Sequence, residues 1–459
     1  MLFDLDKQSK RRFFYELYLI AVIAIPMMVS QLAQVGTGFI DTLMSGWAGK
    51  DDLAAVGLGS GIFVTILITL FGIPTALNPI LSQSFGAKRF DVMRREAQQG
   101  FWLCAIVGAV GIVILLLLCI PLQNILKWSE YGVKTTVWYL YAIAVGLPAA
   151  ILHRAFQSYA AALGRTTPVM WIGIIGLILN IPLNYIFING LYGLPRMGGA
   201  GCGAASAIVF WFNVIGLYLY FIKNKYFRQF ELNRDWTLPR WVDIAPILRL
   251  GLPICCSFFL EVSLFTFITM LIANSGVQFV AAQQVVMTIG SVLYMLPQSL
   301  GAAVSARVGQ SIGAKQRQRA YYISGVCVVV GAIGGVFIGL VLAILRVPLV
   351  SFFTNDAEII LIGANLLLFS AAYQVVDAIQ TIASGALRGY RVTVIPMVIH
   401  MVSFWVLGLG LGYVLAFGFD LGLYGFWIAL MLSLTIAAIG LTLYLIRIGK
   451  CRITQQFVR

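Results

Sequence analysis

Three acidic residues stand inside long apolar segments of the chain, where a charge is costly. They are Asp41, Glu261 and Asp377. A charged Asp at the centre of a membrane helix costs about 2.5–3.5 kcal/mol, so such a group is expected to be neutral, paired, or facing an aqueous cavity. No Lys or Arg stands deep in any of these apolar segments. We therefore expect the partner of each carboxylate to be mobile: a proton, a metal cation or a cationic ligand.

Polar and aromatic residues near these acids are candidates for the walls of a cavity for large cations. Tyr373 precedes Asp377 by four residues, which places both on one face of a helix. An aromatic ring beside a carboxylate suits a monovalent cation. Ordinary helix packing for the aromatic rings, and hydrogen bonds to a neighbouring helix for the acids, are the alternatives. The remaining candidates for the cavity wall are Gln34, Gln283, Gln284 and Tyr294.

The motifs of enzymes and of ATP-driven pumps are missing from the sequence. His153 and His400 stand alone, without a His-Glu-x-x-His pattern, and no phosphate-binding loop occurs. The seven Cys lack the spacing of metal ligands and are expected to pack as small hydrophobic residues. We predict that the chain is not an enzyme and uses no cofactor.

The composition indicates an integral membrane protein. Among 459 residues, 60% are hydrophobic and 10% are charged, whereas soluble domains have about 45–50% and about 25%. The mean hydropathy is +0.93. Only helices and closed barrels satisfy every backbone polar group within a bilayer, and the apolar runs here are longer than the roughly ten-residue segments of barrel strands. The predicted fold class is therefore all-α integral membrane.

Runs of about 20 apolar residues mark the expected membrane spans. By this criterion the sequence predicts twelve transmembrane helices, at Phe13–Met44, Leu53–Gln83, Gly100–Leu122, Thr136–Ala155, Thr167–Ile188, Ala200–Ile222, Ile244–Asn274, Phe279–Val308, Tyr321–Leu345, Ile359–Leu387, Val392–Phe417 and Gly422–Ile446.

The positive charge follows the predicted topology. The net charge is +14, and twelve spans place 26 of the 31 Lys and Arg on one side of the membrane. The positive-inside rule then predicts that both termini of this multi-pass protein are cytoplasmic. This distribution needs no nucleic-acid partner.

The sequence contains an internal repeat. A shift of 227 positions, falling to about 224 later in the chain, superimposes a series of landmarks. Each copy holds six spans, so the sequence predicts two pseudo-symmetric lobes, residues 1–222 and 244–459, joined by a cytoplasmic linker at 223–243. Parallel repeats of this kind are typical of transporters that work by alternating access. The matched landmarks include Pro26 with Pro253, Gly49 with Gly276, Gln83–Lys88 with Gln310–Lys315, Pro121 with Pro348, Ala162 with Ala386, and Gly198 with Gly422.

The repeats do not share their acids. Glu261 falls opposite Gln34, and Asp41 falls opposite Ile268. The two lobes are thus expected to have one scaffold and divided chemistry, with a cation site in the C-terminal lobe and Asp41 alone in the other.

The chain resembles the multidrug and toxic compound extrusion (MATE) family, in its bacterial NorM branch. The resemblance covers essentially the whole chain. It is carried by Pro26 to Asp41, Leu53-Ala54-Ala55-Val56, Asn78-Pro79 with Gln83, Pro182-Leu183-Asn184-Tyr185, Gly198 to Gly203, Glu261, Ala281-Ala282-Gln283-Gln284, Pro297-Gln298 and Ala386 to Tyr390.

The resemblance implies a V-shaped exporter with two six-helix lobes that exchanges hydrophobic organic cations for Na⁺ or H⁺. It implies cation coupling by the acids at Glu261 and Asp377, a contribution from Tyr373, and a drug cavity lined by Asp41. Glu261 and Asp377 are thereby the candidate ligands of a metal cation. An external acidic loop that contacts drugs in relatives here reads Asn355-Asp356, so Asp356 is a further substrate candidate. We expect a monomer in the lipid bilayer.

Two other functions remain open at this point. A flippase for lipid-linked sugars or other anionic lipids, in the same superfamily, needs cations in its cavity, and none of the predicted spans holds a deep Lys or Arg. A passive channel or scramblase does not need titratable groups in one lobe. Carboxylates serve Na⁺ and H⁺ alike, so both coupling ions remain candidates.

Overall fold

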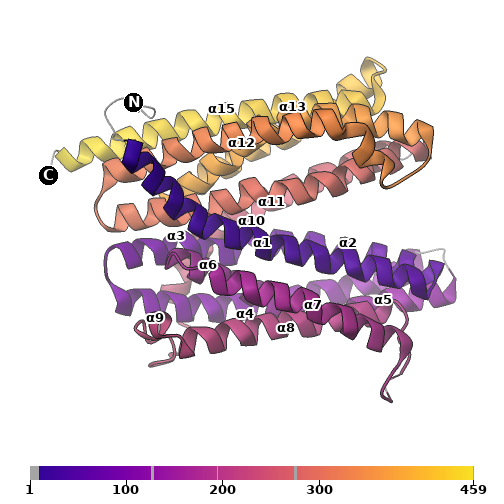
Figure 1. The fold of residues 1–459 in the computed structure, drawn as a ribbon, viewed down its shortest axis with the longest axis horizontal. Coiled ribbons are helices and arrows are strands. Elements are labelled where there is room, and N and C mark those ends of the chain that lie inside the picture. The colour runs from indigo at the N-terminus through magenta and orange to yellow at the C-terminus, as the bar shows by residue number, and fades with distance from the viewer. Residues whose placement is uncertain (1–9, 126–128, 194, 273–275, 458–459) are drawn as a thin grey trace. The chain divides into compact units, whose positions relative to one another are not determined.

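The computed structural model describes residues 10–125, 129–193, 195–272 and 276–457, and every element in these ranges is a helix (Figure 1). Outside the described residues lie three of the basic residues counted for the topology, Lys7, Lys127 and Arg459, and the predicted span end at Asn274. The helices are α1 (Lys10–Ala48), α2 (Lys50–Leu70), α3 (Gly72–Gly86), α4 (Phe90–Ile125), α5 (Glu130–Ala144), α6 (Leu147–Ala162), α7 (Thr167–Asn189), α8 (Ala200–Lys223), α9 (Lys225–Arg228), α10 (Trp241–Ile272), α11 (Val277–Gly313), α12 (Arg317–Ser351), α13 (Ala357–Gly389), α14 (Val394–His400) and α15 (Gly422–Phe457), with the π-helices η3 (Met401–Leu411) and η4 (Val414–Gly418).

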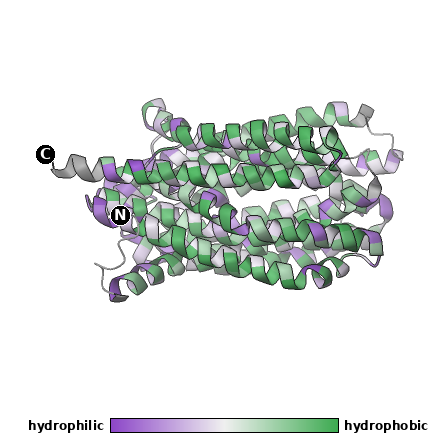
Figure 2. Ribbon diagram, turned by 90° about the horizontal axis from the view of Figure 1, so that it is seen from above, coloured by the Kyte–Doolittle hydropathy of each residue, from purple (hydrophilic) through white to green (hydrophobic). Residues whose placement is uncertain are grey.

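The twelve predicted membrane spans are confirmed, one of them as a broken helix. Eleven helical stretches of the described chain are long and apolar enough to cross a bilayer, and the pair α5–α6, bent by 42°, makes a twelfth. The break falls at Val145 and Gly146, and Pro148 follows in the first turn of α6. Proline has no N–H for the preceding turn, so it favours a new helix start. Figure 2 shows hydrophobic residues along the helices and hydrophilic ones gathered toward their ends.

The eleventh span departs from a regular α-helix. After His400 at the end of α14, the chain continues as the π-helices η3 and η4. The extent of this span agrees with the sequence prediction, but the wider helical geometry was not predicted. Insertions of π-helix are rare and often occur at functional sites, and His400 contributes to the site described below.

The chain folds into two compact units, which divide inside two long helices. The N-terminal unit comprises Ile25–Phe85 and Arg89–Cys255, and the remaining residues form the C-terminal unit. These two divisions lie close to prolines that the repeat pairs, Pro26 in α1 and Pro253 in α10. The short turn Gly86–Lys88 also belongs to the C-terminal unit. The first turns of α1 thus belong to the C-terminal unit, whereas the lobes predicted from sequence divide at the linker.

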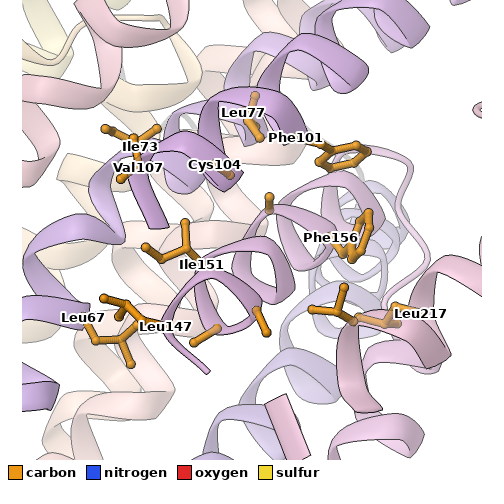
Figure 3. Close-up of a cluster of buried hydrophobic side chains, with 14 of the residues drawn as sticks. Leu67, Ile73, Leu77, Phe101, Cys104, Val107, Leu147, Ile151, Phe156 and Leu217 are labelled. Atoms are coloured by element: carbon orange, nitrogen blue, oxygen red, sulfur yellow. The ribbon is translucent and has the colours of Figure 1, made fainter. Parts of the chain in front are cut away.

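A hydrophobic core holds the N-terminal unit together. Side chains from α2, α3, α4, α6 and α8 meet in it, among them Phe101, Ile151 and Phe156 (Figure 3). The rings of Phe101 and Phe156 pack edge to face with centroids 4.6 Å apart. The predicted linker is part of this unit, because Phe227 and Phe230 are buried in the same core. Gln98 of α4 also donates hydrogen bonds to two linker carbonyls, of Leu232 at 2.9 Å and Arg234 at 2.8 Å.

In the C-terminal unit, α13 contacts α11, α12 and α15. Its start is fixed by Asp356, whose carboxylate accepts hydrogen bonds from the backbone N–H groups of Glu358 and Ile359. This is the usual N-cap arrangement. Because α13 packs against three helices, its middle, which carries Asp377, is surrounded by neighbouring helices.

Candidate functional site

Asp377 lies in the middle of α13 and is 8% exposed. The Gln380 side chain, one helical turn later, donates a hydrogen bond of 3.2 Å to its carboxylate. The other end of the Gln380 amide is 3.1 Å from Nε2 of His400. His400, whose ring stacks on Phe404 at a centroid distance of 5.2 Å, therefore orients the amide that holds Asp377.

Glu261 of α10 stands close enough to Asp377 for their charges to interact. It is half-buried, and its carboxylate lies near the Tyr294 hydroxyl of α11. The Tyr294 hydroxyl also lies near the Thr381 hydroxyl of α13. Three helices thus converge on two carboxylates, a phenol and an alcohol, all of them oxygen groups that suit a hard cation. The structure brings together Glu261, Asp377 and Tyr294, three of the predicted site residues.

A buried arginine near Glu261 corrects one expectation from the sequence. We predicted that no basic side chain lies deep in a span, and the predicted tenth span ends at Leu387, before Arg388. In the structure α13 continues to Gly389, and Arg388 is 8% exposed, close enough for its charge to interact with Glu261. The apolar run ends before Arg388, but a helix needs no apolar residue in its last turn. Within the described part of the chain, Arg388 makes no direct ion pair with either acid.

Tyr373 is close to the acid pair but is also part of the helix packing. Its ring stacks on Trp427 of α15, with centroids 6.0 Å apart and planes 22° apart. The indole therefore covers one face of the ring. The predicted shared face with Asp377 agrees with the structure, since the charge of Asp377 acts on the Tyr373 hydroxyl.

Two predicted substrate residues make no contact with the acid pair among the described residues. The side chain of Gln284 is exposed, whereas its neighbour Gln283 is buried and donates to the Thr269 hydroxyl at 2.8 Å. Asp356 is exposed as the N-cap of α13. The sequence Asp356-Ala-Glu358 before an apolar run is a typical start of a helix, and this signal explains the place of Asp356 in the fold.

Asp41 lies in the N-terminal unit, 4% exposed, within a cage of neutral donors. Asn180 and Asn184 of α7 donate to one carboxylate oxygen at 3.2 and 2.7 Å, and Ser206 of α8 donates to the other at 2.5 Å. The alternative weighed for this acid, hydrogen bonding to neighbouring helices, therefore describes its surroundings. These three donors were not predicted. The pair Asn180 and Asn184, at a spacing of one helical turn, was the available signal.

Gln34 forms a second polar pair in the same unit. Its amide nitrogen is 2.9 Å from Nδ1 of His153 on α6. His153 is 1% exposed, and its Nε2 has no hydrogen-bond partner among the described residues. The sequence shows only that His153 lacks a His-Glu-x-x-His pattern, and its contact with Gln34 was not predicted.

The repeat explains both polar pairs. The shift of 227 pairs Gln34 with Glu261, and the shift of 224 that matches Ala162 with Ala386 pairs His153 with Asp377. The neutral pair Gln34–His153 is therefore the repeat counterpart of the acid pair Glu261–Asp377.

The same relation holds in reverse for Asp41. Its counterpart is Ile268, and the counterpart of Ser206 is Leu430. Ile268 and Leu430 lie together in a mostly apolar cluster with Phe265, Phe426 and Trp427, and Gln283 is its polar member. Each unit thus holds one acidic site, and the other unit carries a neutral or apolar version of it.

Comparison with known proteins agrees with this architecture. The MatE family model matches residues 26–186 and 253–414, which correspond to the two repeats. The chain is 46% identical over 461 residues to a probable multidrug resistance protein NorM of Chromobacterium violaceum, covering 99% of both chains. It is 46% identical over 441 residues to the protein of the same name from Neisseria meningitidis serogroup A, covering 96% of both.

Solved structures with the same fold are also known. The MATE transporter NorM-NG, in complex with a small molecule and a monobody, has a TM-score of 0.81 at 42% identity, covering 95% of both chains. The eukaryotic MATE transporter AtDTX14 has a TM-score of 0.86 at 21% identity, covering 96% of this chain and 99% of that one. With the family model matching both halves and relatives aligned along nearly its entire length, the chain belongs to the MatE family of MATE transporters.

Proposed function

We propose that the chain is a multidrug efflux pump that exports hydrophobic organic cations in exchange for Na⁺ or H⁺, with Glu261 and Asp377 as the binding site of the coupling cation. Relatives along the whole chain are named multidrug resistance proteins, and the solved structure of NorM-NG holds a small molecule. The observation that carries the coupling proposal is the closeness of two membrane carboxylates without a direct ion pair among the described residues.

Charge balance favours one monovalent cation at this site. Two ionised acids and the guanidinium of Arg388 leave one net negative charge. Na⁺ or a proton neutralises it, and Tyr294 and Thr381 supply further oxygen atoms. A buried uncompensated charge is costly, so the site favours occupation by the coupling ion.

Asp41 supports the substrate part of the proposal. Neutral donors from α7 and α8 stabilise its carboxylate without cancelling its charge. A fixed negative charge that has no basic partner in the described chain attracts an organic cation. Exchange follows if the occupation of the two acidic sites is coupled through alternating access of the repeats.

The location completes the proposal. The distribution of Lys and Arg supports cytoplasmic termini in the inner membrane of a bacterium. A monomer is sufficient, because each unit carries its own acidic site. The flippase alternative is not favoured, because the relatives along the whole chain are multidrug resistance proteins.

Efflux of a fluorescent organic cation from proteoliposomes tests the proposal, driven separately by a Na⁺ gradient and by a pH gradient. The wild-type protein is expected to respond to one of them. Glu261→Gln and Asp377→Asn are expected to abolish the response, whereas Glu358→Gln, an exposed acid of the same unit, serves as the control. Normal gradient-driven efflux in both site variants contradicts the proposal.

A further inference from the structure

A hydrophilic cavity of about 730 Å³ lies in the C-terminal unit, between the first turns of α1 and the turn that joins α11 to α12. Nothing in the proposed transport uses it. Its lining carries four basic residues, Arg12, Lys315, Arg317 and Arg319, and one acid, Glu16. Among the described lining residues the charge is therefore +3.

Two of the basic groups of the cavity, those of Arg319 and Arg12, are held in place by other side chains. Glu16 is 1% exposed, and one of its oxygens is 2.7 Å from both Nε and Nη2 of Arg319. Its other oxygen accepts a bond of 2.9 Å from Arg307, which does not line the cavity. The single negative charge of Glu16 is thus shared by two arginines.

Two further contacts order this wall. Arg319 also donates through Nη1 to the side chain of Gln316 at 3.2 Å. The guanidinium of Arg12 lies 5.4 Å from the ring centre of Tyr322, a cation–π contact. Guanidinium groups fixed in this way lose little freedom when they bind a phosphate, for which their geometry is well suited.

Exposed aromatic side chains of α1 lie beside the cavity. Phe14 and Tyr18 are both 64% exposed, and Tyr15, which also lines the cavity, is 55% exposed. Exposed aromatic side chains at the end of a membrane helix are typical of the level of the lipid headgroups. The cavity therefore offers a cationic pocket beside a surface suited to lipid.

We infer that this cavity binds the headgroup of an anionic phospholipid of the cytoplasmic leaflet. Its phosphate contacts the basic residues, and its acyl chains lie along the aromatic surface of α1. The inference rests on the proposed orientation, which places this end of the chain at the cytoplasmic side, where anionic lipids meet basic pockets between helices. A lipid bound here joins α1 to the start of α12, as the ion pairs of Glu16 do from within.

Native mass spectrometry of the purified full-length protein, titrated with phosphatidylglycerol or phosphatidylcholine, tests the inference. We expect retention of phosphatidylglycerol in preference to phosphatidylcholine. The double variant Lys315→Gln/Arg317→Gln is expected to bind phosphatidylglycerol at least about tenfold more weakly, since each basic residue near an anionic headgroup adds to the affinity for the lipid. The matched control Lys223→Gln/Lys225→Gln removes two exposed charges from the N-terminal unit and is expected to change nothing.

Equal losses in the two double variants, or no preference between the lipids, overturn the inference. Soluble glycerol phosphate is the third arm, because a free phosphate would share the same contacts. Displacement of phosphatidylglycerol by millimolar glycerol phosphate identifies a soluble anion as the ligand and contradicts a lipid site. Should the double variant not fold, the loss of wild-type lipid retention at high salt replaces it. Glu261→Gln separates the two proposals, since it is expected to lose transport and keep the lipid.

Discussion

The two acidic sites differ in how their charge is treated. In the N-terminal unit Asp41 is alone and is surrounded by amide and hydroxyl donors of fixed position. In the C-terminal unit the charges of Glu261 and Asp377 interact, and Arg388, whose charge also acts on Glu261, makes no ion pair with either acid in the described chain. The first environment stabilises an existing negative charge. The second leaves a charge that only an added cation can balance.

The repeat makes this difference informative, because the scaffold is shared. Where one unit has the acid pair, the other has Gln34 and His153 in contact. Where that unit has Asp41, the first has Ile268 in a mostly apolar cluster. Duplication supplied two copies of each position, and each unit now uses a different one. An exchanger with separate ion and substrate sites is the functional form that this division supports.

The largest effect is expected from removing the charge of the acid pair. Asp377→Asn keeps the shape and the hydrogen bond from Gln380 but removes one of the two negative charges. With Arg388 nearby, the site then has no net charge to attract a cation, so gradient-driven export should fall to the level of liposomes without protein. Binding of the coupling ion by isothermal titration calorimetry checks the cause. Undiminished ion binding in this variant shows that Asp377 is not a ligand.

A large loss of stability is expected when the apolar counterpart of Asp41 is made acidic. Ile268→Asp places a carboxyl group in a lining whose polar side chains are Gln283 and Trp427. The Gln283 amide already donates to the Thr269 hydroxyl, so the new carboxyl group lacks a prepared set of donors such as that around Asp41. Burying a polar group without a partner costs roughly 2–7 kcal/mol. Thermal unfolding of the detergent-purified variant should therefore occur well below that of the wild type. The isosteric control Ile268→Leu should unfold at a temperature close to that of the wild type. Equal unfolding temperatures for all three proteins contradict the view that the counterpart of the Asp41 site is unsuited to an acid.

Much of the fold could be predicted from the sequence, because hydrophobic length and repetition are strong signals. The twelve spans are confirmed, and the match of Pro26 with Pro253 coincides with the helices that change unit. The 42° break between α5 and α6 was not predicted, although Pro148 marks it. Hydropathy averages over a window and does not register a local break.

The sites were less accessible from the sequence. The three acids stood out, because a charge in an apolar segment is conspicuous, and the structure places Glu261 and Asp377 together. Their neutral partners did not stand out: Asn184 and Ser206 resemble many other polar residues in spans. The burial of Arg388 is not apparent from the sequence either, since a charged residue after an apolar run usually marks the end of a membrane span. Partners from different helices depend on rotation about each helix axis, which a single segment does not specify.

A smaller effect is expected from weakening the cage around Asp41. Asn184→Ala removes the bond of 2.7 Å while Asn180 and Ser206 remain. Loss of one partner of a buried charged group costs about 1–3 kcal/mol, so the protein should unfold at lower temperature and export organic cations more slowly. Ion binding at Glu261 and Asp377 should be unchanged. Loss of ion binding in Asn184→Ala, measured by the same calorimetry, contradicts the view that the site of Asp41 and the site of Glu261 and Asp377 are independent.

The smallest effect is expected at the neutral pair that mirrors the cation site. His153→Gln keeps a buried polar side chain beside Gln34 and removes the imidazole, whose Nε2 has no hydrogen-bond partner among the described residues. Because this pair carries no acid, the coupling ion has no reason to bind there, and transport should change less than about twofold, within the roughly 1 kcal/mol of one neutral hydrogen bond. Export rates of His153→Gln and Asp377→Asn, measured side by side, compare the repeat-related positions directly. A loss in His153→Gln as severe as that in Asp377→Asn means that both units take part in ion coupling, because a purely neutral pair has no charge whose removal could stop transport.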